Sequence, residues 1–327
     1  MAKQRRIRGE WKRLAVQAAA FLLQNPKLHH FFLGVIDKGE TKSVCVPGLN
    51  CYSCPAAVGA CPIGSLQATL SGGYKKPAFP FYVLGLLLLF GLLLGRWICG
   101  WLCPFGWVQD LIYKIPFPKK LHTFRGERYL RMLKYAVLLV LVIGLPLYSA
   151  VKGVLVPWFC KLVCPSGTLF GAIPLLLANE SLRSQIGFSF WWKVGVLAVL
   201  LSLSVFLSRP FCRYLCPLGA IYGLMNRVSL THLDYEADKC VSCGKCEPVC
   251  PMGIDPKQPF NSMECIRCGR CARACPTESL SLRFGRKDSH KKSTKETLAN
   301  SEKCDRIAIE QNGASPQSKE GKEYDKD

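Results

Sequence analysis

Long apolar runs separated by basic segments characterise the chain from residue 14 to about residue 227. Four runs come close to the ~20 residues that a helix needs to cross ~30 Å of hydrocarbon: Leu14–Ile36, Phe79–Gly95, Tyr135–Val151 and Gly187–Ser208. The first run is interrupted by Asn25, Pro26 and Lys27, and a cleaved signal peptide is its alternative interpretation. Tryptophans border the later runs, as they do at membrane interfaces. The pattern therefore predicts four transmembrane helices.

Basic residues between the apolar runs predict the orientation of the chain. The N-terminus and the segment Lys114–Lys134 are both strongly basic, which favours the cytoplasmic side. Two cytoplasmic segments need an even number of crossings between them, so the first and second runs both cross. The other two runs return the chain to the cytoplasm at Arg209 and Arg213, and Arg96 is expected to anchor the inner boundary. We expect a multi-pass protein of the bacterial inner membrane with both termini in the cytoplasm.

The charge of the chain fits a membrane protein better than a nucleic-acid-binding protein. The formal net charge is +21 and 50% of the residues are apolar, but the basic residues alternate with the apolar runs instead of forming one patch. After Arg286 the sequence is polar with few apolar residues, which predicts disorder. The expected organisation is a basic N-terminus (1–13), a four-helix membrane domain (14–227), a second domain (228–285) and a polar tail (286–327).

The second domain contains one cysteine spacing twice. The runs are Cys240-x2-Cys243-x2-Cys246-x3-Cys250-Pro and Cys265-x2-Cys268-x2-Cys271-x3-Cys275-Pro. This is the bacterial two-cluster ferredoxin pattern, in which the fourth cysteine of each run ligates the other cluster. One [4Fe–4S] cluster is therefore expected on Cys240, Cys243, Cys246 and Cys275, and the other on Cys265, Cys268, Cys271 and Cys250. Zinc is the alternative, but zinc sites usually pair two C-x2-C motifs across a longer spacer.

Two β-prone runs flank these cysteines, at Ser229–Tyr235 and Ser279–Phe284. Such runs fit the edge strands of a small ferredoxin fold. The predicted fold class is an all-α polytopic membrane domain followed by an α+β bacterial 2[4Fe–4S] ferredoxin-like domain.

A Cys-Pro-x-Gly motif occurs four more times, each time before an apolar helical stretch. The motifs begin at Cys61, Cys103, Cys164 and Cys216. The last three have a second cysteine four residues earlier, at Cys99, Cys160 and Cys212, whereas Cys51 and Cys54 precede the first. Along the predicted spans the motifs alternate between the outer and inner sides. The membrane domain is therefore predicted to be a tandem repeat of two-helix units with parallel halves.

Motifs on the same side can combine into metal sites. The inner side offers four thiols, from Cys99, Cys103, Cys212 and Cys216. The outer side offers one more than a cluster needs, from Cys51, Cys54, Cys61, Cys160 and Cys164, with Cys45 nearby. We hypothesise one or two further [4Fe–4S] clusters at the membrane boundaries. The alternatives are disulfides on the oxidising outer side and buried free thiols on the inner side.

The stretch from Trp11 to Leu282 resembles the membrane polyferredoxins of the NapH/MauN/NosR type. The motifs that carry the resemblance are Cys45-Val-Pro-Gly-Leu-Asn-Cys51-Tyr-Ser-Cys54-Pro, Cys99-Gly-Trp-Leu-Cys103-Pro-Phe-Gly, Cys212-Arg-Tyr-Leu-Cys216-Pro-Leu-Gly and the doubled ferredoxin run. The resemblance implies a four-helix inner-membrane protein that takes electrons from quinol and passes them to redox partners, such as a ferredoxin-type or terminal reductase subunit. The chain departs from the NapH pattern in its extra outer motifs, and it lacks the flavin-bearing periplasmic domain of NosR-like members. Both departures leave the partner open.

The motifs favour electron transfer without a nucleotide or haem. The sequence contains no nucleotide-binding glycine motif and no C-x-x-C-H haem site. Electrons are therefore expected to pass through clusters, quinones and partner proteins, as in a quinol-dehydrogenase-like component of an anaerobic respiratory chain. Asp110, His29 and His30 are candidates for proton handling, with interfacial or solvated side chains as the simpler interpretation.

One alternative is a factor that donates electrons for maturation or redox sensing of another metalloenzyme. The same motifs support it, because a fold does not decide a function. Turnover distinguishes the two: a respiratory component oxidises quinol at the rate of its partner reductase, whereas a maturation factor acts rarely. A passive membrane anchor is disfavoured, because repeated ligand motifs would have no purpose in it.

Overall fold

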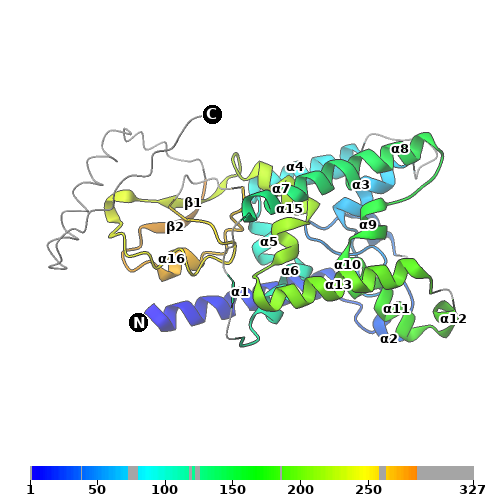
Figure 1. Cartoon of the computed structure of the whole chain (residues 1–327), viewed down its shortest axis with the longest axis horizontal. Coiled ribbons are helices and arrows are strands. Elements are labelled where there is room, and N and C mark those ends of the chain that lie inside the picture. The colour runs from blue at the N-terminus through cyan, green and yellow to red at the C-terminus, as the bar shows by residue number, and fades with distance from the viewer. Residues whose placement is uncertain are drawn as a thin grey trace. The chain divides into compact units, whose positions relative to one another are not determined.

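The described chain is mostly helical and carries one two-stranded sheet (Figure 1). The computed structural model describes residues 2–37, 39–72, 80–117, 120–121, 126–184, 186–257 and 263–285. The helices are α1 (Ala2–Gln24), α2 (His30–Leu33), α3 (Pro62–Leu70), α4 (Phe81–Leu93), α5 (Trp97–Trp101), α6 (Pro104–Tyr113), α7 (Glu127–Val137), α8 (Leu145–Val151), α9 (Trp158–Leu162), α10 (Pro165–Gly167), α11 (Ile173–Ala178), α12 (Glu180–Arg183), α13 (Phe188–Phe206), α14 (Pro210–Tyr214), α15 (Pro217–Met225) and α16 (Arg270–Ala274). The strands are β1 (Thr231–Tyr235) and β2 (Leu280–Phe284).

Among the described residues, two helices are long and apolar enough to cross a membrane. One runs over Glu127–Val151 and consists of α7, the π-helical segment Leu138–Gly144 and α8; the other is α13. Only 28% and 17% of their most apolar windows are buried, so most of these apolar side chains face outward. Outward-facing apolar helices of this length are typical of a membrane protein. The predicted runs Tyr135–Val151 and Gly187–Ser208 coincide with these two helices.

The two N-terminal runs fold differently from the prediction. The run Phe79–Gly95 contains α4, but this helix has 13 residues and is shorter than a crossing needs. The run Leu14–Ile36 is not one helix, because α1 begins at Ala2 and ends at Gln24, and only the short α2 follows. Pro26 explains the break, since proline cannot donate a backbone N–H and disfavours helix in the residue before it. The prediction of a single helix over this run is therefore wrong.

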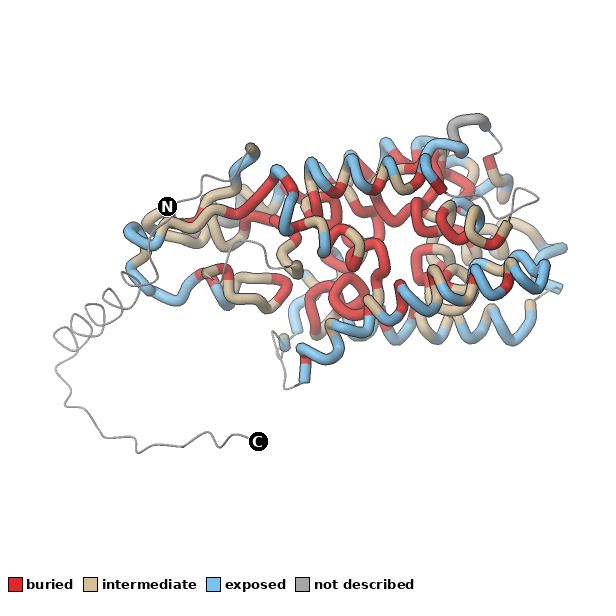
Figure 2. Tube along the Cα trace, turned by 90° about the horizontal axis from the view of Figure 1, so that it is seen from above, coloured by how far each residue is buried: buried red, intermediate tan, exposed pale blue. Residues whose placement is uncertain are grey.

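Four helices begin at the Cys-Pro motifs, inside the bundle. The cysteine is the extended N-cap residue and the proline the first helical residue of α3, α6, α10 and α15. Proline suits this position, because it has no N–H to leave unpaired and its φ is already helical. α3 packs beside the π-helical segment and α8, whereas α15 packs beside α7. Buried residues concentrate between the helices (Figure 2).

The sheet forms the base of the ferredoxin-like part. β1 pairs antiparallel with β2, with Leu233 opposite Leu282, and both strands fall within the predicted β-prone runs. Leu233 and Leu280 are buried against Cys246. The segment between β1 and β2 carries the doubled cysteine run. Its helix α16 lies in the second cysteine run and packs against α1. α1 therefore extends from the ferredoxin-like part into the helical part (Figure 1).

A buried ion-pair group joins three helices at the end of the helical part nearest the sheet. Arg209 donates to both carboxylate oxygens of Asp110, at 2.9 and 2.5 Å, and Arg13 lies 3.1 Å from the same carboxylate. The group thereby links α1, α6 and the start of α14. Arg209 and Arg213, which the charge pattern assigns to the cytoplasmic end, are 0% and 1% exposed. Their burial is tolerated because Asp110 and Glu127 pair with them.

A second ion-pair group fastens the ferredoxin-like part to the helices. Glu264 pairs with Arg96 at 2.9 Å and also with Lys134 of α7. Burial raises the pKa of Glu264, but these two cations lower it and prevail. Arg96 is fully buried and donates to the carbonyl oxygen of Met263 at 2.7 Å. The expectation that Arg96 anchors the inner boundary is therefore wrong, since its guanidinium is held inside the protein.

We predict that Asp110→Asn destabilises the fold by about 3–5 kcal/mol, because it leaves Arg209 and Arg13 buried without a counter-charge. Chemical denaturation of the detergent-solubilised protein measures the change. Glu236→Gln is the matched control, because its ion pair with Arg283 is exposed and is worth at most about 1 kcal/mol. Equal stability of the two variants would show that the buried group does not hold α1, α6 and α14 together.

Candidate iron–sulfur sites

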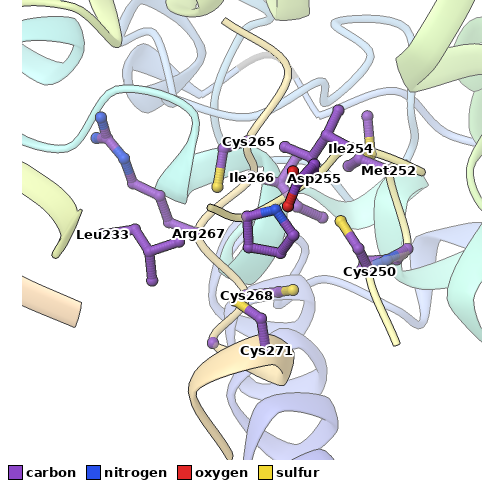
Figure 3. Close-up of a pocket in the computed structure, with 13 residues that line it drawn as sticks. Leu233, Cys250, Met252, Ile254, Asp255, Cys265, Ile266, Arg267, Cys268 and Cys271 are labelled. Atoms are coloured by element: carbon purple, nitrogen blue, oxygen red, sulfur yellow. The ribbon is translucent and has the colours of Figure 1, made fainter. Parts of the chain in front are cut away.

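Cysteines from both ferredoxin runs line one cavity on the side that faces the helices (Figure 3), which we call the proximal site. The cavity is lined by Cys250, Cys265, Cys268 and Cys271. Cys250 belongs to the first run and the other three to the second. The structure thus brings together the crossed set that the spacing predicts. Apolar residues such as Ile266 and Met252 fill the space around the thiols.

The other four cysteines line a second cavity, the distal site. Its lining includes Cys240, Cys243, Cys246 and Cys275. Here the first run contributes three thiols and the second run one, which again matches the crossed pattern. Cys243 is exposed, and Val241 beside it is 59% exposed. The distal site is therefore the one that a soluble partner can approach.

The two sites differ in how strongly they favour thiolates. Burial raises the pKa of Cys265 in the proximal site to about 12. Burial also raises that of Cys275 in the distal site, but hydrogen bonds with Ser279 and Thr277 outweigh it and lower the pKa to about 7. Because a metal cluster binds thiolates, loading of the proximal site must release protons.

Four thiols between the helices form what we call the inner thiol set. Its members are Cys99, Cys103, Cys212 and Cys216, each between 5% and 7% exposed. They come from α5, the N-cap of α6, α14 and the N-cap of α15. Cys216 lies within electrostatic range of the other three thiols. The structure therefore brings together the four inner cysteines that the sequence pairs.

Hydrogen-bond donors and cations surround the inner thiol set. The backbone N–H of Gly219 donates to the Cys216 sulfur at 3.3 Å, and Gln109 Nε2 donates to the Cys212 sulfur at 3.4 Å. Arg96 donates to the carbonyl oxygen of Cys212 at 3.1 Å, and Arg209 donates to that of Cys99. N–H groups and positive charges beside the sulfurs favour a negatively charged ligand sphere.

A second group of four thiols, the outer thiol set, lies near α3, α9 and α10. Its members are Cys51, Cys61, Cys160 and Cys164, and Cys164 lies within electrostatic range of Cys51 and Cys61. Cys160 in turn lies within range of Cys164 and Cys51. Cys54 is fully buried, and its thiol instead contacts Asn25 Oδ1 at 3.6 Å. The Cys45 thiol donates a hydrogen bond to Ser65 Oγ, with the sulfur and oxygen 3.3 Å apart. Cys54 is thus close to Cys51, but its thiol and that of Cys45 each have a polar partner outside the four converging thiols.

The donor chemistry fits iron–sulfur clusters better than single metal ions. Among the described residues, no three His, Cys, Asp or Glu side chains are close enough together to hold one metal ion. A [4Fe–4S] cluster gives each thiolate its own iron, so its four ligands stand farther apart than those of one ion. All four sets offer only cysteine sulfur, and the described cysteines are free thiols. The residues present therefore fit [4Fe–4S] clusters.

The proximal site packs directly on the inner thiol set. The carbonyl oxygen of Ile266 contacts Gly100 so closely that a side chain there would collide with it. Trp101 Nε1 donates to the carbonyl oxygen of Arg267 at 3.1 Å. Gly100 and Trp101 follow Cys99, while Ile266 and Arg267 follow Cys265. Ile266, Cys268, Cys99 and Cys212 belong to one continuous buried core.

The three residues expected to handle protons lie in different environments. Asp110 is held between Arg209 and Arg13; burial raises its pKa, but these cations prevail and keep it well below its usual range. A carboxylate held in this way favours a structural role. His29 is exposed, and its ring packs against that of His30 with the centroids 4.4 Å apart. Within the described part of the chain neither histidine bonds to a thiol of these sets, so their role stays a prediction.

The sequence reasoning missed the polar residues that support the inner thiols. Gln109, Arg209 and Glu264 lie outside the cysteine motifs and carry no ligand signature of their own. Only Gln109 had a detectable signal, because a glutamine stands six residues after Cys103 and again six residues after Cys61.

Comparisons with known proteins agree with these sites. A family model described as a 4Fe-4S binding domain matches residues 77–123 and 188–234, and one described as a 4Fe-4S dicluster domain matches residues 225–289. An uncharacterised protein of Methanocaldococcus jannaschii is 35% identical over 175 residues, which are 50% of this chain and 61% of the relative. No solved structure matches.

Several relatives carry a descriptive name, among them a putative electron transport protein of Escherichia coli named YccM. The methylamine utilization ferredoxin-type protein MauN of Methylobacillus flagellatus is 32% identical over 58% of this chain and 60% of its own length. The regulatory protein NosR of Stutzerimonas stutzeri is 33% identical over 42% of this chain and 17% of its own length. The chain spans about half to three fifths of the first curated relatives that it matches. With its cysteine motifs and these matches together, the chain is similar to the ferredoxin-type iron–sulfur proteins of the MauN and NosR type.

Proposed function

We propose that this protein passes electrons between the quinone pool of a bacterial inner membrane and a redox partner protein. The observation that carries the proposal is the packing of the proximal site on the inner thiol set through Gly100 and Ile266. A [4Fe–4S] cluster, when bound, takes up and releases one electron at a time. Two such sites in contact, one among membrane helices and one in a ferredoxin-like part, form a path from lipid to cytoplasm.

Three clusters are assigned to this path. The distal and proximal sites hold the two ferredoxin clusters on the crossed ligand sets, and the inner thiol set holds a third. The chain's own residues prepare the inner site for this third cluster. Gln109 and the N–H of Gly219 hold two of the sulfurs in place, while Arg96 and Arg209 balance negative charge in an apolar surrounding.

The proposal includes four membrane crossings arranged as a tandem repeat. The crossings are α1 with the loop after it, the run Phe79–Gly95 around the short α4, α7 to α8, and α13. The two segments that match the same family model, 77–123 and 188–234, each contain a helix followed by a C-x3-C-P motif, which supports the repeat. The basic segments support a cytoplasmic location of both termini.

The distal site is the exchange point with the partner. Cys243 and Val241 are exposed there, whereas no thiol of the proximal site is fully exposed. A ferredoxin-type protein or a terminal reductase subunit can therefore approach the ligands of the distal site more closely than those of the proximal site.

A second candidate function is electron donation for the maturation or redox control of another metalloenzyme. It is favoured by one specific observation, the similarity to proteins named as regulatory. The two candidates differ in rate, because a respiratory component must oxidise quinol as fast as its partner enzyme turns over.

We predict that Cys99→Ala and Cys216→Ala each lower the iron content by about four atoms per chain, because each removes one ligand of a [4Fe–4S] cluster. Iron analysis of anaerobically purified protein measures the loss. Cys45→Ser is the control: its buried thiol bonds to Ser65 outside every set, so its iron content should stay unchanged. An unchanged iron content in both alanine variants would remove the inner cluster from the proposal.

We predict that Gly100→Val slows reduction of the ferredoxin clusters by a quinol analogue while leaving the iron content intact. The new side chain collides with the carbonyl of Ile266 and pushes the proximal site away from the inner thiol set. Rapid-mixing absorbance under anaerobic conditions measures the rate. Gly85→Val on α4 is the matched control, because a Cβ at Gly85 meets nothing within 4 Å. Equal rates in wild type and Gly100→Val would mean that electrons do not cross this contact.

A further inference from the structure

The outer thiol set repeats the architecture of the inner one. In each set a cysteine caps a Pro-started helix of the first half of the helical part: Cys61 caps α3 and Cys103 caps α6. Each set also takes a C-x3-C pair from the second half, Cys160 with Cys164 or Cys212 with Cys216. Gly167 donates its N–H to the Cys164 sulfur at 3.4 Å, as Gly219 does to Cys216 at 3.3 Å.

A pair of equivalent glutamines makes the repetition specific. Gln67 donates from Nε2 to the Cys160 sulfur at 3.5 Å, and its Oε1 accepts the backbone N–H of Phe159 at 3.0 Å. Gln109 donates to the Cys212 sulfur at 3.4 Å, and its Oε1 accepts the N–H of Phe211 at 3.2 Å.

Each of these glutamines stands six residues after its capping cysteine and bridges to the pair in the other half of the helical part. Gln67 is fully buried and Gln109 is 1% exposed, so both amides are committed to these bonds. The two glutamines match in spacing, burial and bonding partners. The inner and outer thiol sets therefore have equivalent local structures.

The fourth thiol of the outer set comes from a different place than in the inner set. The position four residues before Cys61 is Ala57, whereas the position four before Cys103 is Cys99. Cys51 takes this role, because its sulfur lies 3.5 Å from the point where a Cβ on Gly167 would stand, beside Cys164. Gly167 leaves that space open for the sulfurs.

Positive charge also accompanies the outer set. Lys42 is 3% exposed, and it donates to the carbonyl oxygens of Tyr52 at 2.8 Å and Cys54 at 3.2 Å. Its charge acts on Cys51, and that of Lys193 acts on Cys51, Cys160 and Cys164. These cations correspond to Arg96 and Arg209 beside the inner set, and they offset the negative charge of a thiolate-bound cluster.

One short segment separates the two sets. The backbone N–H of Leu49 lies near the Cys103 thiol, and the carbonyl oxygen of Leu49 accepts from Ser166 at 3.3 Å, two residues after Cys164. The hydroxyl of the buried Tyr222 donates to the carbonyl oxygen of Pro47 at 3.0 Å, and its ring lies within electrostatic range of both Cys61 and Cys103. The two sets are therefore neighbours across Pro47–Leu49.

We propose that the outer thiol set is a fourth [4Fe–4S] site, with Gln67 as its positioning residue. Its ligands are Cys51, Cys61, Cys160 and Cys164, and Cys54 and Cys45 are not ligands. The site extends the electron path past the inner set toward the far side of the membrane. Its iron binding does not depend on the proposed quinone reaction, so each can fail without the other.

The first test is metal analysis of the full-length protein purified anaerobically. Cys51→Ala and Cys160→Ala should each lose about four irons per chain, because each removes one ligand of a cluster. Cys54→Ser is the matched control and should keep the wild-type iron content. The site is overturned if Cys54→Ser loses the iron while Cys51→Ala keeps it, if zinc replaces iron in the wild type, or if alkylation and mass measurement show Cys160 in a disulfide.

The second test does not require removal of a ligand. Gln67→Leu deletes a hydrogen bond to one cluster sulfur, and Gln109→Leu deletes the equivalent bond in the inner site. Since hydrogen bonds to sulfur raise the potential of such clusters, each variant should lower the potential of a different cluster in an EPR-monitored redox titration. Gln67→Glu, which retains the acceptor for Phe159, should preserve the iron content. If Gln67→Leu changes no potential, or shifts the same signal as Gln109→Leu, the outer site is contradicted.

Discussion

The fold depends on ion pairs that neutralise charged side chains buried among apolar helices. Fully buried Arg96 and Arg209 would be strongly destabilising alone, since desolvation costs several kcal/mol per ion. Each is placed between an acidic side chain, Glu264 or Asp110, and the backbone of a cysteine motif. The same contacts fasten α1, α14 and the ferredoxin-like part to one another. Structural and electrostatic requirements are thereby met by the same residues.

The Cys-Pro motif explains why the thiols gather inside the bundle. Proline starts a helix directly after the cysteine, and the glycine two residues beyond the proline leaves its N–H free to reach the sulfur. The N-terminus of such a helix favours negative charge, because its first N–H groups have no partner within the helix. Four helices of this kind start from positions alongside the spans, so their capping sulfurs meet in the core.

Much of this arrangement could be predicted from the sequence. The crossed ligand sets follow from the doubled spacing of Cys240 to Cys275, and β1 and β2 fall where alternating β-prone residues occur. The pairing of Cys99 and Cys103 with Cys212 and Cys216 followed from the order of the apolar runs. Each cysteine motif spans only a few residues with a fixed spacing, so rules about neighbouring residues were sufficient to predict which cysteines come together.

The rest depends on tertiary contacts that no local pattern contains. The break of the first apolar run at Pro26, the burial of Arg96 and the choice of Cys51 over Cys54 are decided by packing between distant segments. Gln67 and Gln109 act across the two halves of the helical part, at sequence separations that a spacing rule does not cover. The repeated spacing of the two glutamines from a cysteine is visible in the sequence. Their role becomes evident only from their contacts with Cys160 and Cys212 in the structure.

The central claim is that thiols inside the helical part hold iron. Mössbauer and EPR spectroscopy of the anaerobically purified, detergent-solubilised protein tests it most directly, since together they count [4Fe–4S] clusters per chain. The account predicts more clusters than the two of the ferredoxin-like part, with all iron in the [4Fe–4S] form. Two clusters only, with no iron lost when Cys103 and Cys216 are replaced together, would contradict it.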